Sequence, residues 1–234
     1  MNAMLLRILI IVISISTVLP IHGQQPVAES DYGQWGKLSI GAISHEGKWV
    51  SYLMRYPSGN DTLYVQNAKG GKATAFPKCH SGQFGGERWF AYKKAKDSLI
   101  LYDLMSGKPT VYTSVSDYLF SENGSHFLFS SSGQDKKLTI VNLRDHTEQA
   151  VENILLWKSD KRHKNVAFIK AEGHGTKLYT LAFNSSSEPK MVINADNLNI
   201  TAIAWQDNGM SLALAAASMA DPDKSNRGNI SSIL

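Results

Sequence analysis

Three short segments contain the pattern that decides the fold: SHEGKWVSY (residues 44–52), DTLYVQN (residues 61–67) and GGKATAF (residues 70–76). Each is rich in Val, Leu, Tyr, Phe, Trp or Thr, which favour extended and half-buried backbone. Ser58, Gly59 and Asn60 lie between the first two segments, and Gly70 and Gly71 begin the third. Gly and Asn reach at low cost the positive φ angles of hairpin turns. The pattern predicts short antiparallel strands joined by tight turns.

The same order of segments recurs along the chain. The second unit reads GGERWFAY, DSLILYD and SGKPTVY (residues 85–112), and the third reads SENGSHFLF, KKLTIVN and TEQAV (residues 121–151). The fourth reads KRHKNVAFI, TKLYTLAF and EPKMVI (residues 161–193), and a fifth begins with QDNGMSLALA (residues 206–215). An internal repeat of this kind indicates an architecture built from similar units.

Large apolar residues recur at a nearly constant spacing in these units. Aligning them makes Trp49, Trp89, Phe127 and Val166 equivalent, and the equivalent in the fifth unit, Leu212, follows after a longer connection. A second series with nearly the same spacing consists of Leu63, Leu99, Leu138 and Leu178. Both series give a repeat of about 40 residues, within the range of known repeat architectures.

Repeats of this length with three or four short strands are typical of β-propeller blades. In the first unit Trp49 and Leu53 share one face and Tyr52 and Met54 the other, so both faces need cover from neighbouring units. We therefore predict an all-β fold, a partial β-propeller with about four complete four-stranded antiparallel blades plus part of a fifth. A β-helix is the alternative, although its repeats are shorter and more regular.

Two further expectations follow from a partial propeller. After residue 23 we expect essentially no helix, and we expect the polar, turn-rich residues 221–234 to be poorly ordered and to add no outer strand to the fifth blade. The first and last sheets are expected to leave apolar faces uncovered.

The first 23 residues have the order of a secretory signal. One basic residue, Arg7, precedes the 12-residue apolar run ILIIVISISTVL, and Pro20 and Gly23 follow it. We expect cleavage after Gly23, with residues 24–234 forming an incomplete N-terminal β-propeller domain. An uncleaved membrane anchor is the alternative, but 12 apolar residues are short of the roughly 20 that span a bilayer. With Cys79 as the one cysteine, no internal disulfide can form, and we predict an exported, periplasmic protein.

Composition excludes several classes of protein. Hydrophobic residues make up 43% of the chain and charged residues 19%, values that do not fit a disordered chain. The 24 basic residues against 20 acidic ones give a net charge of +4, and the charges are dispersed, so we expect no nucleic-acid partner. No second apolar run reaches spanning length, so no membrane span is expected after the signal.

The opening segment DYGQWGKLSIGAISHEGKWVSYLMRYPSGNDTLYVQN (residues 31–67) resembles the start of the propeller in exported bacterial serine peptidases of the prolyl oligopeptidase family. That family includes the dipeptidyl peptidase and acylaminoacyl peptidase types. The S-x-x-G pattern at Ser44 and Ser121, degenerate at Gln206, also resembles the blade motif of Tol-system propellers. The resemblance covers about residues 31–220.

This resemblance implies a propeller followed by an α/β-hydrolase domain that carries the catalytic serine, acid and histidine. No G-x-S-x-G motif occurs in the 234 residues, so no catalytic residue is carried over. The chain is expected to be an N-terminal fragment, inactive alone, that gates the passage of short peptides to a hydrolase domain outside it. The alternative is a non-enzymatic periplasmic propeller that binds a protein or envelope partner.

Residues that suggest other chemistry are better explained by structure, and we expect no catalytic, cofactor-binding or metal site. Ser131, Ser132 and Asp135 share a predicted hairpin loop that contains no histidine. The glycine-rich residues 82–86 lack the Lys-Ser/Thr of a phosphate loop and predict a turn. The basic residues 158–164 predict a solvated connection, and Cys79 a small inert core residue. The six histidines outside the signal lie near predicted turns without metal-ligand spacing: His45, His80, His126, His146, His163 and His174.

Overall fold

The computed structural model describes the chain from residue 28 onward, with short gaps. The described residues are 28–95, 97–131, 133, 136–184, 188–196, 198–218 and 229–233. The predicted signal, residues 1–23, lies outside them. No helix among the described residues is long and apolar enough to cross a membrane.

The chain divides into two compact units, residues 1–35 and residues 36–234. The described part of the first unit contains one short 3₁₀-helix, η1 (Glu29–Gln34). The Asp31 carboxylate accepts a hydrogen bond of 2.9 Å from the Ala28 N–H at the start of this helix, and the rings of Tyr32 and Trp35 meet edge to face. The expectation of no helix after the signal is therefore wrong for these six residues, because a local side-chain cap supports a short helix there.

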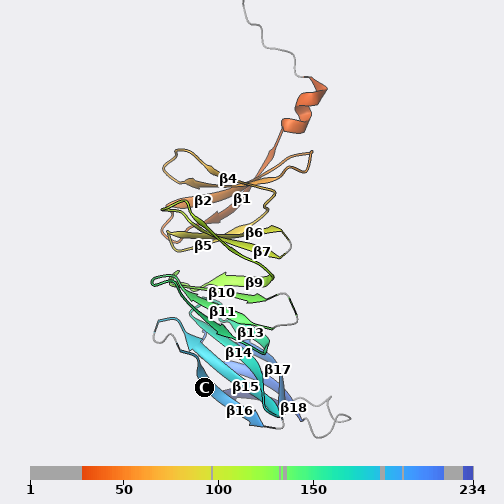
Figure 1. Cartoon of the computed structure of the whole chain (residues 1–234), viewed down its shortest axis with the longest axis vertical. Helices are drawn as coiled ribbons and strands as arrows, with labels where there is room; N and C mark the ends of the chain where they lie inside the picture. Colours follow the sequence, from red (N-terminus) through yellow and green to blue (C-terminus); the bar gives the residue numbers. More distant parts are fainter. Residues whose placement is uncertain are drawn as a thin grey trace, which may run out of the picture. The chain divides into compact units, whose positions relative to one another are not determined.

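The second unit consists of five antiparallel sheets, four with four strands and the last with three (Figure 1). Within each sheet the strands lie in chain order, so every connection inside a sheet is a hairpin. This confirms the predicted all-β partial propeller of four complete blades plus part of a fifth. The strands, four to a sheet until the last, are β1 (Lys37–Ile43), β2 (Trp49–Arg55), β3 (Thr62–Asn67), β4 (Thr74–Pro77), β5 (Gly82–Gly85), β6 (Trp89–Ala95), β7 (Ser98–Asp103), β8 (Pro109–Tyr112), β9 (Val115–Phe120), β10 (His126–Ser131), β11 (Leu138–Asn142), β12 (Thr147–Val151), β13 (Ile154–Ser159), β14 (Asn165–Glu172), β15 (Gly175–Ala182), β16 (Lys190–Asp196), β17 (Leu198–Trp205), β18 (Leu212–Ser218) and β19 (Asn229–Ile233).

The fifth sheet has one strand more than the sequence predicts. Strand β19 pairs with β18, with Ile233 opposite Leu212 and Asn229 opposite Ala216. Residues 229–233 thus form a strand where the sequence predicts none, and the β-branched Ile230 and Ile233 favour its extended backbone. No fourth, outer strand is found among the described residues. Residues 221–228 and 234 lie outside the described part.

The core lies between consecutive sheets. Leu53 and Leu63 of the first sheet pack against Phe90 and Tyr92 of the second, and all four are at most 7% exposed. Three further apolar clusters join the second sheet to the third, the third to the fourth and the fourth to the fifth. Each sheet thus depends on its neighbours for burial of its apolar side chains.

The strand assignment of the repeat is confirmed, but the register is one residue off in three units. Trp49, Trp89, Phe127, Val166 and Leu212 all lie in the second strand of their sheets. Trp49 pairs with Asn67 and Trp89 with Asp103, but the matching positions in later sheets are His126, opposite Asn142, and Asn165, opposite Ala182.

A shift of one residue moves a side chain to the other face of its sheet. Trp49 and Trp89 lie in the clusters toward the following sheet, whereas Phe127 and Val166 lie in the clusters toward the preceding one. The apolar alignment failed because the true equivalents in the last three sheets, His126, Asn165 and Ser211, are polar. The leucine series is correct, since Leu63, Leu99, Leu138 and Leu178 occupy matching positions of the third strands.

Residues 82–86, predicted as a turn, form an inner strand for most of their length. Strand β5 pairs Gly82 with Tyr92 and Gly85 with Trp89, and only Gly86, at a φ angle of 62°, belongs to the turn. A Cβ atom on Gly82 would lie 2.2 Å from the Phe90 ring, and one on Gly85 would lie 2.3 Å from the Phe120 ring. The glycines are there because aromatic rings occupy the space of their side chains, not because the chain turns.

Candidate functional site

The turn between the first and second strands has a shared hydrogen-bonded design in four of the five sheets. Its first residue is Ser44, Ser121, Asp160 or Gln206, and the N–H of that residue donates to the carbonyl five residues later. The carbonyl of the same residue accepts from the N–H three residues later. In the first and third sheets the serine Oγ also accepts the N–H of the next strand's first residue, at 2.9 Å. The S-x-x-G motif thus describes a serine cap followed by a residue at positive φ.

His163 takes the place of the motif glycine in the fourth sheet. Its φ angle is 55°, whereas Gly47, Gly124 and Gly209 hold the same position in other sheets at 65° to 73°. A side chain in this left-handed region costs about 1–2 kcal/mol. The ring compensates by placing Nδ1 3.2 Å from the Phe120 carbonyl, and the His163 carbonyl accepts from the Glu122 N–H at 2.9 Å. His163 therefore fastens the turn of the fourth sheet to the third.

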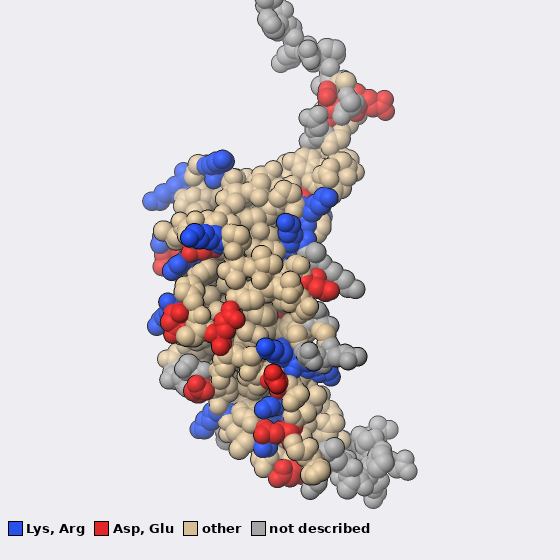
Figure 2. Space-filling model, viewed as in Figure 1, with Lys and Arg blue, Asp and Glu red and all other residues tan. Residues whose placement is uncertain are grey.

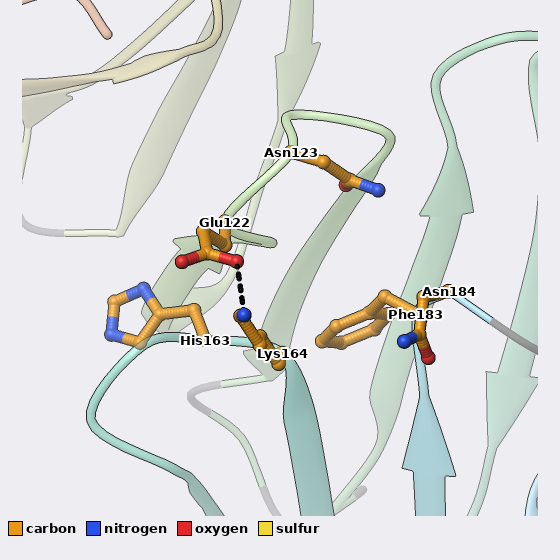
Figure 3. Close-up of a pocket in the computed structure, with 6 residues that line it drawn as sticks. All are labelled: Glu122, Asn123, His163, Lys164, Phe183 and Asn184. Carbon is orange, nitrogen blue, oxygen red and sulfur yellow. Dashed lines mark ion pairs between the residues drawn. The ribbon is translucent and has the colours of Figure 1, made fainter.

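A cavity of about 190 Å³ opens beside this contact (Figure 3). The Lys164 ammonium lies 3.3 Å from the Glu122 carboxylate, and both side chains are a little over two-fifths exposed. Phe183 and Asn184 directly follow β15, and Asn123 comes from the turn of the third sheet. The cavity therefore offers an ion pair, two amides and one aromatic ring, which suit a small polar group or one amino-acid side chain.

A chain of hydrogen bonds leads from the exposed Asn123 to the buried His126. The Asn123 side-chain oxygen accepts from the hydroxyl of Ser121 at 2.9 Å and from the hydroxyl of Ser125 at 2.6 Å. The Ser125 hydroxyl also lies 2.8 Å from Nδ1 of His126. The His126 ring lies against the Phe183 ring, with 5.1 Å between centroids.

The Ser125–His126 pair is arranged for structure rather than for nucleophilic catalysis. A serine hydroxyl has one hydrogen, and Ser125 directs it to Asn123, so His126 Nδ1 is the donor in the second bond. A base that activates serine must instead accept the proton. Both residues are buried, at 6% and 8% exposed. Burial lowers the pKa of His126, and Arg144 lowers it further while Asp145 opposes the shift. The Asp145 carboxylate accepts hydrogen bonds from Thr147.

The remaining predicted residues are spread over the sheets. Ser131 ends β10, and its hydroxyl accepts the Lys137 N–H at 3.0 Å, while Ser132 and Asp135 lie outside the described residues. Cys79 is buried between the first two sheets, as expected, and burial raises the pKa of its thiol. Within the described parts of the chain, no three His, Cys, Asp or Glu side chains gather as metal ligands would.

The basic residues 158–164 are more than a solvated connection. They form the end of β13 and the turn that follows, where Asp160 is 3% exposed and accepts the N–H groups of Lys164 and Asn165. The sequence predicts a connection here but not its buried Asp160, because the basic residues around it indicate a solvated segment. The three-residue spacing of Asp160 and His163, which repeats that of Ser44 and Gly47, is the signal that identifies it.

On the face viewed in Figure 2, acidic and basic side chains are interspersed over the sheets. Apart from this view, Lys161 of the fourth sheet's turn lies 3.8 Å from Asp207 of the fifth sheet's turn, and both side chains are exposed. Local charge on this face is therefore mixed rather than gathered by sign.

No protein-family model matches the chain, and no curated protein matches it either. Among solved structures, the β-propeller domain of the trilobed protease from Pyrococcus furiosus aligns with 85% of this chain and 69% of its own, at 9% identity and a TM-score of 0.48. The acylaminoacyl peptidase of Pyrococcus horikoshii aligns with 88% of this chain and 39% of its own, at 7% identity and a TM-score of 0.45. TolB from Acinetobacter baumannii aligns with 80% of this chain and 52% of its own, at 16% identity and a TM-score of 0.38. These similarities are distant, and the chain spans well under two thirds of the last two proteins.

Proposed function

We propose that this propeller controls access to the active site of an exported serine peptidase that hydrolyses short peptides. The observation that supports this is the opening segment, residues 31–67. Its resemblance to the start of a peptidase propeller is in sequence, and its strands β1, β2 and β3 form the first sheet of a stack of blades. The resemblance and the fold agree on the same residues.

An access domain selects substrates through its shape, and the buried polar groups of this propeller stabilise that shape. Ser44, Ser121 and Asp160 cap turns, and Ser125 bonds both to His126 and to Asn123. These groups stabilise the blades and leave bond cleavage to a triad carried elsewhere. The propeller then contributes selection by size, since only short peptides reach a covered site.

The test asks whether the polypeptide that contains this propeller reacts as a serine hydrolase in its native cell. The exported fraction is treated with a fluorophosphonate and then precipitated with an antibody raised against residues 36–218. We expect a labelled polypeptide heavier than the 25.8 kDa of this chain. Heat-treated fractions control for non-specific labelling. Recovery of the propeller only in an unlabelled polypeptide would contradict the proposal.

The second candidate function is a propeller that binds a protein or envelope partner, and the cavity beside Lys164 favours it. The ion pair with Glu122 and the neighbouring Phe183 ring form a mixed polar and aromatic recess at the edge of two sheets. In the same precipitation, this function predicts an unlabelled propeller that brings down an envelope protein. Loss of that protein with Glu122→Lys, and its retention with Glu148→Lys on the outer strand β12, would support binding at the cavity.

A further inference from the structure

The first sheet exposes an apolar face. Residues Leu38, Ile40 and Ile43 of β1 are 58%, 84% and 65% exposed. Ile40 lies opposite Tyr52, which lies opposite Tyr64, and the two tyrosine rings stack with 5.2 Å between centroids. These side chains, with Val50 and Met54, form one surface, which we call the front face of the first sheet. Contiguous exposed apolar surface of this kind indicates a site of association.

The matching face of each later sheet packs against the preceding sheet. Tyr52 corresponds to Tyr92 in the second sheet and to Phe129 in the third, since each lies three residues after the strand position of Trp49. Tyr92 is 7% exposed against the first sheet, and Phe129 packs in the cluster between the second and third sheets. In the fourth and fifth sheets the matching positions are Phe168 and Leu214, both buried against the preceding sheet. The first sheet thus has the binding face of an internal blade.

The fifth sheet has the complementary back face. Its side turned away from the fourth sheet carries Ala202 opposite Ala215 and Ala204 opposite Ala213. Three of the four earlier sheets have a small residue at the position of Ala213, and each is at most 3% exposed: Ser51, Ala91 and Ala167. The third sheet has the buried Leu128 at this position. The next sheet covers this position in the earlier sheets, and Ala213 continues the series without a covering sheet in the described chain.

Charge does not oppose contact between the two faces. On the described strands β1–β4, the side chains in register with Tyr52 are apolar, Thr or Gln. On β17 and β18, those in register with Ala213 are Ala, Asn or Thr. Faces without charged groups lose no ionic solvation when they pack together.

We propose that two copies of this chain associate head to tail, with the front face of the first sheet in one copy packed on the back face of the fifth sheet in the other. The contact continues the series of four sheet-to-sheet interfaces already present in each copy. It is heterologous, because two different surfaces meet. The proposal concerns the 234-residue chain, and it rests on the packing of its sheets rather than on the peptidase function.

The test is the mass of the purified chain in solution, measured by sedimentation over a wide range of concentration. Wild type is expected to associate as concentration rises. Ile40→Glu places a charge on the front face and Ala204→Glu places one on the back face, at positions that are both exposed in a single copy. Each variant alone should associate at least about tenfold more weakly than wild type. Val111→Glu, at a 59% exposed residue of the outer strand β8, is the matched control and should associate like wild type.

Mixing the two variants gives the decisive result. An Ile40→Glu copy retains its back face and an Ala204→Glu copy retains its front face, so the mixture should form a dimer that neither forms alone. Circular dichroism of each variant confirms folding, and Ala202→Glu replaces Ala204→Glu if the latter unfolds. Three outcomes would overturn the proposal: a wild-type monomer at all concentrations, an Ala204→Glu variant that associates like wild type, or a mixture that stays monomeric.

Discussion

The Ser44 hydroxyl donates a hydrogen bond of 2.7 Å to Oε2 of Glu87, which ties the first turn of one sheet to the first turn of the next. The other carboxylate oxygen of Glu87 accepts the Glu46 N–H, and its carbonyl accepts the Trp49 indole N–H at 3.0 Å. One residue of the second sheet thus satisfies three donors of the first. The contact shows how neighbouring blades are joined by polar groups at the edge as well as by the apolar core.

Glu87→Ala should lower the free energy of unfolding by about 1–3 kcal/mol, because it leaves the buried Ser44 hydroxyl without its charged acceptor. Glu122→Ala is the matched control, since it removes an exposed ion pair with Lys164 and should cost less than about 1 kcal/mol. Urea unfolding followed by tryptophan fluorescence measures both. Equal losses in the two variants would show that the Glu87 contact is no stronger than a surface ion pair.

Gly47 and Gly124 have the same backbone conformation but different surroundings. Both φ angles are positive, at 73° and 65°, so alanine at either position costs about 1–2 kcal/mol in strain. A Cβ atom on Gly47 would meet open space, whereas one on Gly124 would lie 2.7 Å from the Gly86 backbone nitrogen. Gly124→Ala should therefore cost about 1–3 kcal/mol more through overpacking. Thermal unfolding of the two variants checks this, and similar melting temperatures would contradict the close approach of the second and third sheets.

Asp103 gives the stability of the chain a dependence on acidic pH. Burial raises the pKa of this carboxyl, but hydrogen bonds from Arg88 and from the N–H groups of Met105 and Ser106 outweigh it and lower the pKa to about 2. Because the pKa in the folded chain lies below that in the unfolded chain, the stabilisation is complete above pH about 4 and is lost as the pH falls toward 2.

Asp103→Asn should lower the free energy of unfolding by about 1–2 kcal/mol at neutral pH, a range that allows for the half-exposed Arg88 partner. The difference from wild type should shrink as the pH falls from 4 toward 2. Urea unfolding at several pH values measures it. A difference that stays constant over this range would contradict the assigned pKa.

His126 should destabilise the fold below pH about 6.5. Burial lowers its pKa in the folded chain below the ordinary value of 6.5, so the unfolded chain takes up a proton first as the pH falls. The stability it contributes is present above pH 6.5 and is lost as the pH falls through the folded pKa. His126→Gln should therefore flatten the loss of stability between pH 7 and 5.5, measured by urea unfolding at several pH values. An unchanged slope in His126→Gln would show that another group titrates.

The fold could be predicted because its strands and turns differ sharply in composition, and because this difference recurs in every unit of the repeat. Strand β5 could not be predicted, because its Gly-Gln-Phe-Gly sequence lacks the side chains that identify a strand. The reason for its glycines is visible only in the structure, where the rings of Phe90 and Phe120 occupy the space that their side chains would need. The predicted alignment of the second strands is one residue off where the polar His126 and Asn165 occupy the position of Trp49 and Trp89. The turn at Asp160 and His163 is visible in the sequence by its spacing alone.

The central claim is that this propeller supplies structure and access, and that its serines are not nucleophiles. The most direct measurement is fluorophosphonate labelling of the purified chain, followed by mass spectrometry and by assay with dipeptidyl and prolyl chromogenic substrates. The account predicts no labelled serine and no hydrolysis above background, because Ser125 is buried and donates its hydrogen to Asn123 rather than to His126. Stoichiometric labelling of Ser125 that His126→Ala abolishes would contradict it.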